Sequence, residues 1–393
     1  MNTLFPAYRT LVTSPEMLRA CQSLTTFAEV LRYLKDWFQA SALSDDHFLA
    51  QLNQCNRQLL DIPYEQLRGC WLPYRYEKSR GCLHWCLPQG PAVEPFQDDT
   101  IGRYRQSILN VILQPKTSLE AVLVQPVDVD LWQPCSFIFH LSRCGSTLLS
   151  GCAVQLDSVQ ILSESPLLTE VLLDDSLDAA QQQRLLPRLV DLQAAPFPDR
   201  PQLVIKWNAW DMLRWALIRQ TFPQVPCVLL VRNPVEVLAS HQKMAGRHMS
   251  GDPAMRVFDK VFDTCGMGIL AFRIAVLHRL MTAMYEVLQQ GPSTDIQLVD
   301  YTQLNIHTII QLLQSWGEDI DAATCARIQQ RLQLNAKFPA QAFVADVQQK
   351  HSVFDEQQTA QINRHLMPVY QALHQNESLD PRESVGERFD VFL

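Results

Sequence analysis

The sequence lacks the features that direct a chain into or across a membrane. No uncharged apolar run in its 393 residues approaches the roughly 18 residues that a membrane-spanning helix needs. Residues 1–9 also lack the charged segment, followed by a long apolar run, that a signal peptide requires. We therefore expect a cytoplasmic protein with no membrane partner.

The cysteines lack the paired spacing of a metal site or a disulfide framework. Eleven cysteines are scattered along the chain without a Cys-x-x-Cys pair, which in an intracellular protein indicates reduced, mostly buried thiols. Cys82, His84 and Cys86 could still bind a metal ion with Cys70 as a fourth ligand. The same residues also form an ordinary alternating strand pattern. Because Cys-x-x-Cys pairs are missing, we expect no metal site.

Charged residues are also scarce. They make up 19% of the chain, and the formal net charge is −8. This acidic balance argues against a nucleic-acid partner, although a local basic pocket for an anionic ligand is compatible with it. With 47% hydrophobic residues, the chain is long enough to form one large domain and a smaller one.

One phosphate-binding pattern is present, although it lacks the Gly-Lys-Ser/Thr ending of a Walker A loop. Residues 137–150 combine an apolar, aromatic-rich run, a turn and the start of an apolar helix. Such a turn directs backbone N–H groups and the positive end of a helix dipole at one point, where a phosphate would bind. The alternative is a plain turn whose Ser and Thr cap the helix. The residues that we expect to line a phosphate site are Arg143, Cys144, Gly145, Ser146 and Thr147.

A second pattern follows at residues 226–240. A buried strand leads into Arg232, and Pro234 then opens a helix where its missing N–H costs nothing. Ser240 lies about two helical turns further, on the face beneath Arg232. We expect the arginine fork and the hydroxyl to converge on one dianion. The alternative is an arginine that pairs with an acid or caps a neighbouring helix.

Together the two patterns resemble the sulfotransferases that use 3′-phosphoadenosine 5′-phosphosulfate (PAPS) as donor. In that family a loop with one glycine and a leading Lys or Arg binds the 5′-phosphosulfate, and an Arg and a Ser spaced like Arg232 and Ser240 bind the 3′-phosphate. The resemblance covers about residues 135–305. It implies an α/β fold in which a parallel sheet is flanked by helices, with PAPS as donor and PAP (3′-phosphoadenosine 5′-phosphate) as product.

The resemblance also implies catalytic roles. Lys206 ends the strand before the arginine-bearing one, as does the family's lysine, and is expected at the sulfuryl group with Arg143. The cytosolic enzymes have a catalytic histidine two residues after that lysine, where this chain has Asn208. Tyrosylprotein sulfotransferases and many bacterial relatives instead use an acid at the end of the strand that follows the phosphate-loop helix, a place that Glu164 occupies. We therefore expect Glu164 to be the base, although residues 163–166 also fit an ordinary helix start.

The sequence predicts two domains. Residues 1–130 are expected to form an extra, mainly helical N-terminal domain with an aromatic-rich segment and a short strand at 121–124, and residues 131–393 the P-loop domain. Residues 241–253 fit either a lid over the site or an exposed turn. The Gly-rich C-terminal segment of the cytosolic enzymes is absent.

The sequence thus predicts metal-independent transfer of a sulfuryl group from PAPS to a hydroxyl or amine. It does not identify the acceptor, which is either small or carrier-borne, and it leaves homodimerisation open. The competing hypotheses are a P-loop kinase or NTPase, which the missing Walker motifs disfavour, and a nucleotide-binding protein without catalysis.

Overall fold

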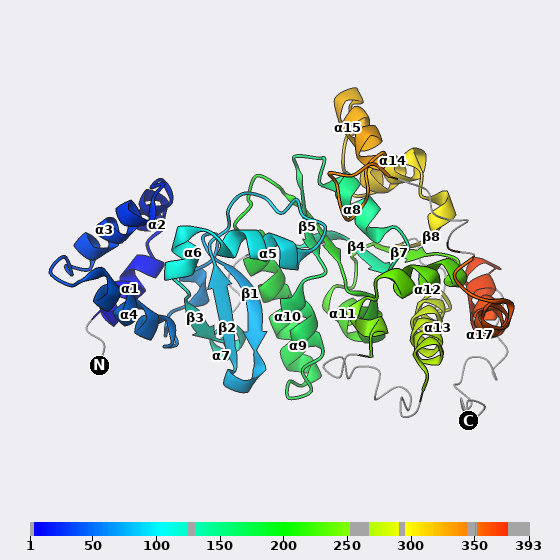
Figure 1. Ribbon diagram of the computed structural model, residues 1–393, viewed down its shortest axis with the longest axis horizontal. Coiled ribbons are helices and arrows are strands. Elements are labelled where there is room, and N and C mark those ends of the chain that lie inside the picture. Colours follow the sequence, from blue (N-terminus) through cyan, green and yellow to red (C-terminus); the bar gives the residue numbers. More distant parts are fainter. Residues whose placement is uncertain are drawn as a thin grey trace. The chain divides into compact units, whose positions relative to one another are not determined.

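Figure 1 shows the computed structural model as a ribbon. It describes residues 4–124, 130–251, 267–290, 295–343, 350 and 352–375.

The chain forms two compact units. The first unit comprises Met1–Gln133 and Leu162–Leu203, and the second comprises Pro134–Ile161 and Val204–Leu393. The boundary expected between residues 130 and 131 lies close to the first of these divisions, but the segment Leu162–Leu203, expected in the second domain, belongs to the first unit. The reason is that its two helices, α9 (Pro166–Leu172) and α10 (Ala179–Ala194), pack against strand β1 (Leu72–Glu77) of the first unit.

The first unit begins with four helices separated by short turns. The chain breaks between α2 and α3, where Thr26 and Glu29 form a reciprocal capping box. Ser44 caps the next helix by accepting from the backbone N–H of His47. The helices are α1 (Phe5–Val12), α2 (Pro15–Gln22), α3 (Phe27–Trp37) and α4 (Asp45–Asn56).

A three-stranded antiparallel sheet in the order β1-β2-β3 forms the rest of the first unit with its helices. The strand expected at residues 121–124 is wrong, because these residues belong to helix α7. The strands are β1 (Leu72–Glu77), β2 (Cys82–Cys86) and β3 (Lys116–Ser118). The helices are η1 (Tyr64–Gln66), η2 (Lys78–Arg80), α5 (Gln97–Arg105), α6 (Ile108–Ile112), α7 (Leu119–Val124), α9 (Pro166–Leu172) and α10 (Ala179–Ala194).

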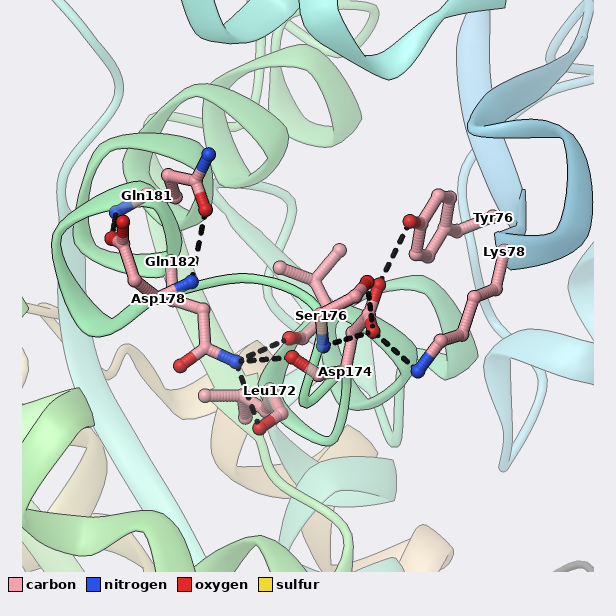
Figure 2. A network of polar contacts seen from close by, with 9 residues as sticks. Tyr76, Lys78, Leu172, Asp174, Ser176, Asp178, Gln181 and Gln182 are labelled. Atoms are coloured by element: carbon pink, nitrogen blue, oxygen red, sulfur yellow. Dashed lines mark hydrogen bonds and ion pairs between the residues drawn. The ribbon is translucent and has the colours of Figure 1, made fainter.

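A polar network ties the β1 hairpin to the turn between α9 and α10 (Figure 2). The carboxylate of Asp174 accepts from the Tyr76 hydroxyl at 2.8 Å and from the backbone N–H and hydroxyl of Ser176 at 2.9 and 2.6 Å. It also pairs with the ammonium group of Lys78. Because the side chain of Asp174 is fully buried, these contacts replace the water that its charge would otherwise require.

The second unit is built on a five-stranded parallel sheet in the order β5-β6-β4-β7-β8, so the α/β fold expected from the sequence is observed. In register, Phe137 lies opposite Cys227 and His140 opposite Leu230. The ends of β5 and β6 carry the chain to and from the first unit. The strands are β4 (Pro134–His140), β5 (Val159–Ser163), β6 (Gln202–Lys206), β7 (Cys227–Val231) and β8 (Ile296–Asp300).

Helices cover both faces of this sheet (Figure 1). Side chains alternate along β4: Ile138 packs in an aliphatic core with residues of α8, α14 and α15, whereas Phe137 and Phe139 contact an aromatic group that includes Trp207. The helices are α8 (Ser146–Ala153), η3 (Ala209–Arg214), α11 (Trp215–Thr221), α12 (Pro234–Lys243), η4 (Arg247–Met249), α13 (Ile269–Leu288), η5 (Tyr301–Gln303), α14 (Ile306–Ser315), α15 (Ala322–Leu332) and α17 (Glu356–Gln375). Among the described helices, none has both the length and the apolar character that crossing a bilayer requires.

Candidate functional site

The turn between β4 and α8 has an unusual backbone. Ser142, Arg143 and Gly145 have φ angles of 64°, 56° and 92°, all in the left-handed region. The backbone N–H of Ser142 donates to Nδ1 of His140 at 3.0 Å. Left-handed residues in a short turn bring backbone N–H groups together into an anion-binding concavity, and the N-terminus of α8 adds its own free donors. The expected order of strand, turn and helix is confirmed.

The side chains of this turn divide into packing and polar groups. Cys144 is fully buried in the aliphatic core of the second unit, and its burial raises the pKa of its thiol to about 12. Cys144 therefore offers a ligand only its backbone. Arg143 donates to the carbonyl of Met244 just after α12. Ser146 and Thr147 begin α8 and are both buried.

Gly145 is required by its surroundings as well as by its backbone conformation. A Cβ atom at this position would lie 2.7 Å from Cδ2 of Leu304 and 3.0 Å from Cδ2 of Tyr301. Both neighbours come from the segment that follows β8. Leu304 and Tyr301 therefore pack against the turn at Gly145, and this packing holds the backbone of the turn in place.

Lys206 ends β6 and is 0% exposed. Its ammonium group donates to the hydroxyl of Thr147 at 3.5 Å, so it lies beside the first turn of α8. Burying a cation is costly unless nearby groups or a ligand compensate it. Lys206 thus places a buried positive charge at the turn.

Arg232 reaches the same turn from the end of β7, because β4 and β7 are adjacent parallel strands. Its Nη1 donates to the carbonyl of Arg143 at 3.3 Å, and its Nε donates to the carboxylate of Glu236 at 2.8 Å. The guanidinium also stacks on the ring of Tyr301, with Cζ 3.8 Å from the ring centroid. These three contacts fix the guanidinium plane beside the turn.

Ser240 lies one helical turn beyond Glu236 on α12, and Pro234 opens this helix as expected. Residues four apart share a helix face, so Glu236 and Ser240 lie on one side of α12, and Arg232 reaches Glu236 from just before the helix. The sequence reasoning missed Glu236 and Tyr301. The i, i+4 spacing of Arg232 and Glu236 is a signal that could have indicated the ion pair.

A further cluster follows Ser240. His241 is buried, and its Nδ1 accepts from the backbone N–H of Gly246 at 3.2 Å. Its pKa is lowered to about 2, first by burial and then by the positive groups around it. Arg143, Arg273 and Lys337 thus place positive charge near His241, although the chain as a whole is acidic.

The segment predicted to be either a lid or a turn is partly described. Up to Gly251 most of it is exposed, although His248 and Met249 are buried and the carbonyl of Met249 accepts from Arg273 at 3.0 Å. Residues 252–253 lie outside the described residues. Closure of a lid stays a prediction.

Glu164 and Asn208 complete the set of expected positions. Glu164 follows β5 directly with a φ angle of 56°, and it belongs to the first unit. Its role as base stays a prediction. The buried Asn208 precedes η3, and its backbone N–H donates to the carboxylate of Asp211 at 3.0 Å.

The chain is similar to several solved structures of sulfotransferases. No protein-family model matches the chain, and no curated protein matches it. Among solved structures, sulfotransferase STF1 of Mycobacterium tuberculosis is 15% identical with a TM-score of 0.39, over 52% of this chain and 72% of that one. Sulfotransferase STF9 of Mycobacterium avium is 12% identical with a TM-score of 0.39, over 66% and 86%. The sulfotransferase domain of the curacin biosynthetic pathway is 15% identical with a TM-score of 0.39, over 61% and 99%. TM-scores below 0.5 do not by themselves establish a relationship.

Proposed function

We propose that this protein is a PAPS-dependent sulfotransferase that transfers a sulfuryl group to a hydroxyl or amine and releases PAP. The observation that carries the proposal is that two cationic side chains, Lys206 and Arg232, both contact the turn between β4 and α8. Lys206, fully buried, contacts Thr147 at 3.5 Å, and Arg232 contacts the carbonyl of Arg143 at 3.3 Å. Two fixed cations and a concave backbone suit a ligand with two separate phosphate groups.

The two ends of the donor would occupy different parts of this site. The 5′-phosphosulfate would accept hydrogen bonds from the backbone of residues 142–147 and from Lys206. The 3′-phosphate would lie at Arg232 and Ser240. Because Glu236 accepts from Arg232, binding of the 3′-phosphate requires either the free N–H groups of the guanidinium or a shift of Glu236.

The reaction would be an in-line transfer with a loose transition state, in which the protein mainly positions groups and stabilises charge. Lys206, Arg143 and the backbone N–H groups of the turn would stabilise the charge that develops on the departing nucleotide. Glu164 would take the acceptor proton. Since a carboxylate is a far weaker base than an alkoxide, the proton would leave late, as the bond to sulfur forms.

The proposal includes a cytoplasmic location and an acceptor that is either small or carrier-borne. It requires no metal ion for transfer. The first unit, which is rich in helices, would contribute to acceptor binding or to formation of a homodimer.

Calorimetric titration of PAP without metal tests the donor site. In wild type we expect PAP to bind and ATP not to. Arg232→Ala should weaken PAP by about 1.5–3 kcal/mol, a factor of about 10 to 150, because it removes charged hydrogen bonds to the 3′-phosphate. The matched control is Arg279→Ala, which removes a part-exposed arginine of α13 that pairs with Glu286 and should leave PAP binding unchanged.

Other outcomes would favour the competing hypotheses. Binding of ATP with Mg²⁺ but not of PAP would contradict the proposal and indicate a kinase-like protein. PAP binding that Arg232→Ala leaves unchanged would contradict the assignment of the 3′-phosphate site. PAP binding without transfer to any acceptor would indicate a non-catalytic nucleotide-binding protein.

A further inference from the structure

A hairpin in the first unit brings together three residue types that bind transition metals. Glu77 ends β1 and Cys82 begins β2, and the two residues are directly opposite each other in the register. His84 lies two residues further along β2, so its side chain lies on the same face as that of Cys82. The link between the strands is the short helix η2, followed by Gly81 in the left-handed conformation. The hairpin thus brings all three side chains together.

The spacing of the three ligand atoms matches a metal site. Oε2 of Glu77 lies 2.9 Å from Nε2 of His84 and 3.7 Å from Sγ of Cys82, and Sγ lies 3.9 Å from Nε2. In a tetrahedral zinc site with bonds of about 2.3 Å to sulfur and 2.0–2.2 Å to nitrogen and oxygen, such atoms lie about 3.3–3.6 Å apart. The observed distances bracket this range. The shortest is the hydrogen bond between Glu77 and His84, which would lengthen slightly on binding.

We propose that Glu77, Cys82 and His84 bind one zinc ion, with a fourth position left for water or another ligand. One sulfur, one nitrogen and one oxygen donor suit zinc, whereas Mg²⁺ and Ca²⁺ require oxygen ligands. Cys82 is buried and the other two side chains are partly exposed, so the ion has a path from solvent. The site is independent of the proposed transfer reaction, and it would join the two strands at the end of the hairpin.

From the sequence alone we expect no metal site, and Cys70 and Cys86 are the partners that the sequence suggests for Cys82 and His84. The structure brings Glu77 to Cys82 and His84 instead. The spacing of the cysteines gives no sign of Glu77, which lies on the preceding strand. Only the register of the hairpin brings its carboxylate close to Cys82 and His84.

Three cations near the site oppose binding, and one of them is Arg75, which lies opposite His84 on β1. Nη1 of Arg80 lies 3.9 Å from Oε2 of Glu77, and Lys116 is the cross-strand neighbour of His84. The side chain of Arg80 is 42% exposed, and its Nη2 donates to the carbonyl of Arg57 at 3.2 Å. Binding should therefore be weaker than in a four-ligand structural site, and it should weaken at acid pH as the thiol and imidazole take up protons.

Titration of the reduced, full-length chain with Co²⁺ alone, followed by competition with Zn²⁺, tests the proposal. We expect about one Co²⁺ per chain, a near-ultraviolet thiolate-to-cobalt charge-transfer band, and loss of that band when Zn²⁺ is added. Cys82→Ser should abolish the band, and Glu77→Gln and His84→Gln should each weaken binding by about tenfold or more. The matched control, Cys70→Ser, should leave the band and the affinity unchanged.

Circular dichroism of each variant distinguishes loss of the site from loss of folding. Saturable binding that disappears in folded Cys82→Ser and weakens in folded His84→Gln would support the site. The absence of saturable binding in wild type would overturn the proposal. An unchanged band in Cys82→Ser, or a band lost in Cys70→Ser, would overturn this set of ligands. If Cys82→Ser does not fold, the affinity of His84→Gln decides, and an unchanged value contradicts the proposal.

Discussion

Gly145 is the residue at which the turn is most sensitive to a single added carbon. Replacing it with alanine forces a left-handed conformation on a residue that disfavours it, and places Cβ 2.7 Å from Leu304. We expect Gly145→Ala to lower the free energy of unfolding by about 2–4 kcal/mol, from backbone strain and overpacking together. It should also abolish PAP binding, because the backbone N–H groups of the turn would be displaced. Denaturant unfolding and calorimetric titration measure the two effects.

Gly251→Ala is the matched control for this change. Gly251 also has a positive φ angle, of 70°, but a Cβ there would meet nothing within 4 Å. Its substitution should cost about 1 kcal/mol, from strain alone. Equal losses in the two variants would show that packing against Leu304 and Tyr301 does not hold the turn.

At the residue scale the sequence predicted where the cationic side chains of the site lie, but not which side chains they contact. It placed Arg232 at a strand end and Lys206 at another, and both lie at the turn after β4. It did not predict that Tyr301 would stack on Arg232, because the two residues are far apart in the sequence and meet only when β7 and β8 pair. Residues brought together by strand pairing have no local signature. Glu164 and Ser240 were chosen by family resemblance, and their roles still require experiment.

At the element scale the most informative feature is the anchoring of the β1 hairpin by Asp174 (Figure 2). Its carboxylate accepts from Tyr76 and Ser176 and pairs with Lys78. Asp174→Asn removes the charge and replaces one acceptor with a donor. We expect a loss of about 2–4 kcal/mol in the free energy of unfolding, because donors in a buried site lose their acceptor. Urea unfolding followed by tryptophan fluorescence measures it.

Asp178→Asn is the control for this substitution. Asp178 caps α10 by accepting from the backbone N–H of Gln181 at 2.8 Å, and asparagine caps helices about as well as aspartate. Its unfolding free energy should change by less than about 0.5 kcal/mol. A similar small change in Asp174→Asn would contradict the anchoring role.

The same anchor gives stability a dependence on pH. Burial alone would raise the pKa of Asp174, but hydrogen bonds from Lys78, Ser176 and Tyr76 outweigh it and lower the pKa from 3.8 to about 2. The unfolded chain therefore takes up the proton first as the pH falls. The stabilisation is complete above about pH 4 and is lost towards pH 2, which amounts to about 2 kcal/mol that Asp174→Asn should not lose.

The sequence predicted the buried parallel strands better than the short apolar segment at residues 121–124. Strands β4, β6 and β7 were clear because buried parallel strands form continuous apolar runs that end in polar turns. Residues 121–124 form a run of the same kind, yet they lie in α7. A short apolar run fits either a buried strand or a helix, and here Leu119 and Val122, which are three apart, are the buried positions. Only the packing of α7 resolves the ambiguity.

At the scale of the whole molecule, the sequence indicated the class of the fold but not the path of the chain. The five-stranded sheet follows from the apolar runs and the turns between them. The assignment of Leu162–Leu203 to the first unit does not, because it depends on the packing of α9 and α10 against β1. A chain that leaves one unit and later returns to it has no local signal in the sequence that marks the change.

The most direct test of the central claim is a crystal structure of the chain with PAP. We predict the 5′-phosphate within hydrogen-bond distance of the backbone N–H groups of residues 142–147 and of Lys206. The 3′-phosphate should contact Arg232 and Ser240. A nucleotide bound elsewhere, or one whose 3′-phosphate faces solvent while Arg232 stays paired only with Glu236, would contradict the assignment of this site to the sulfuryl donor.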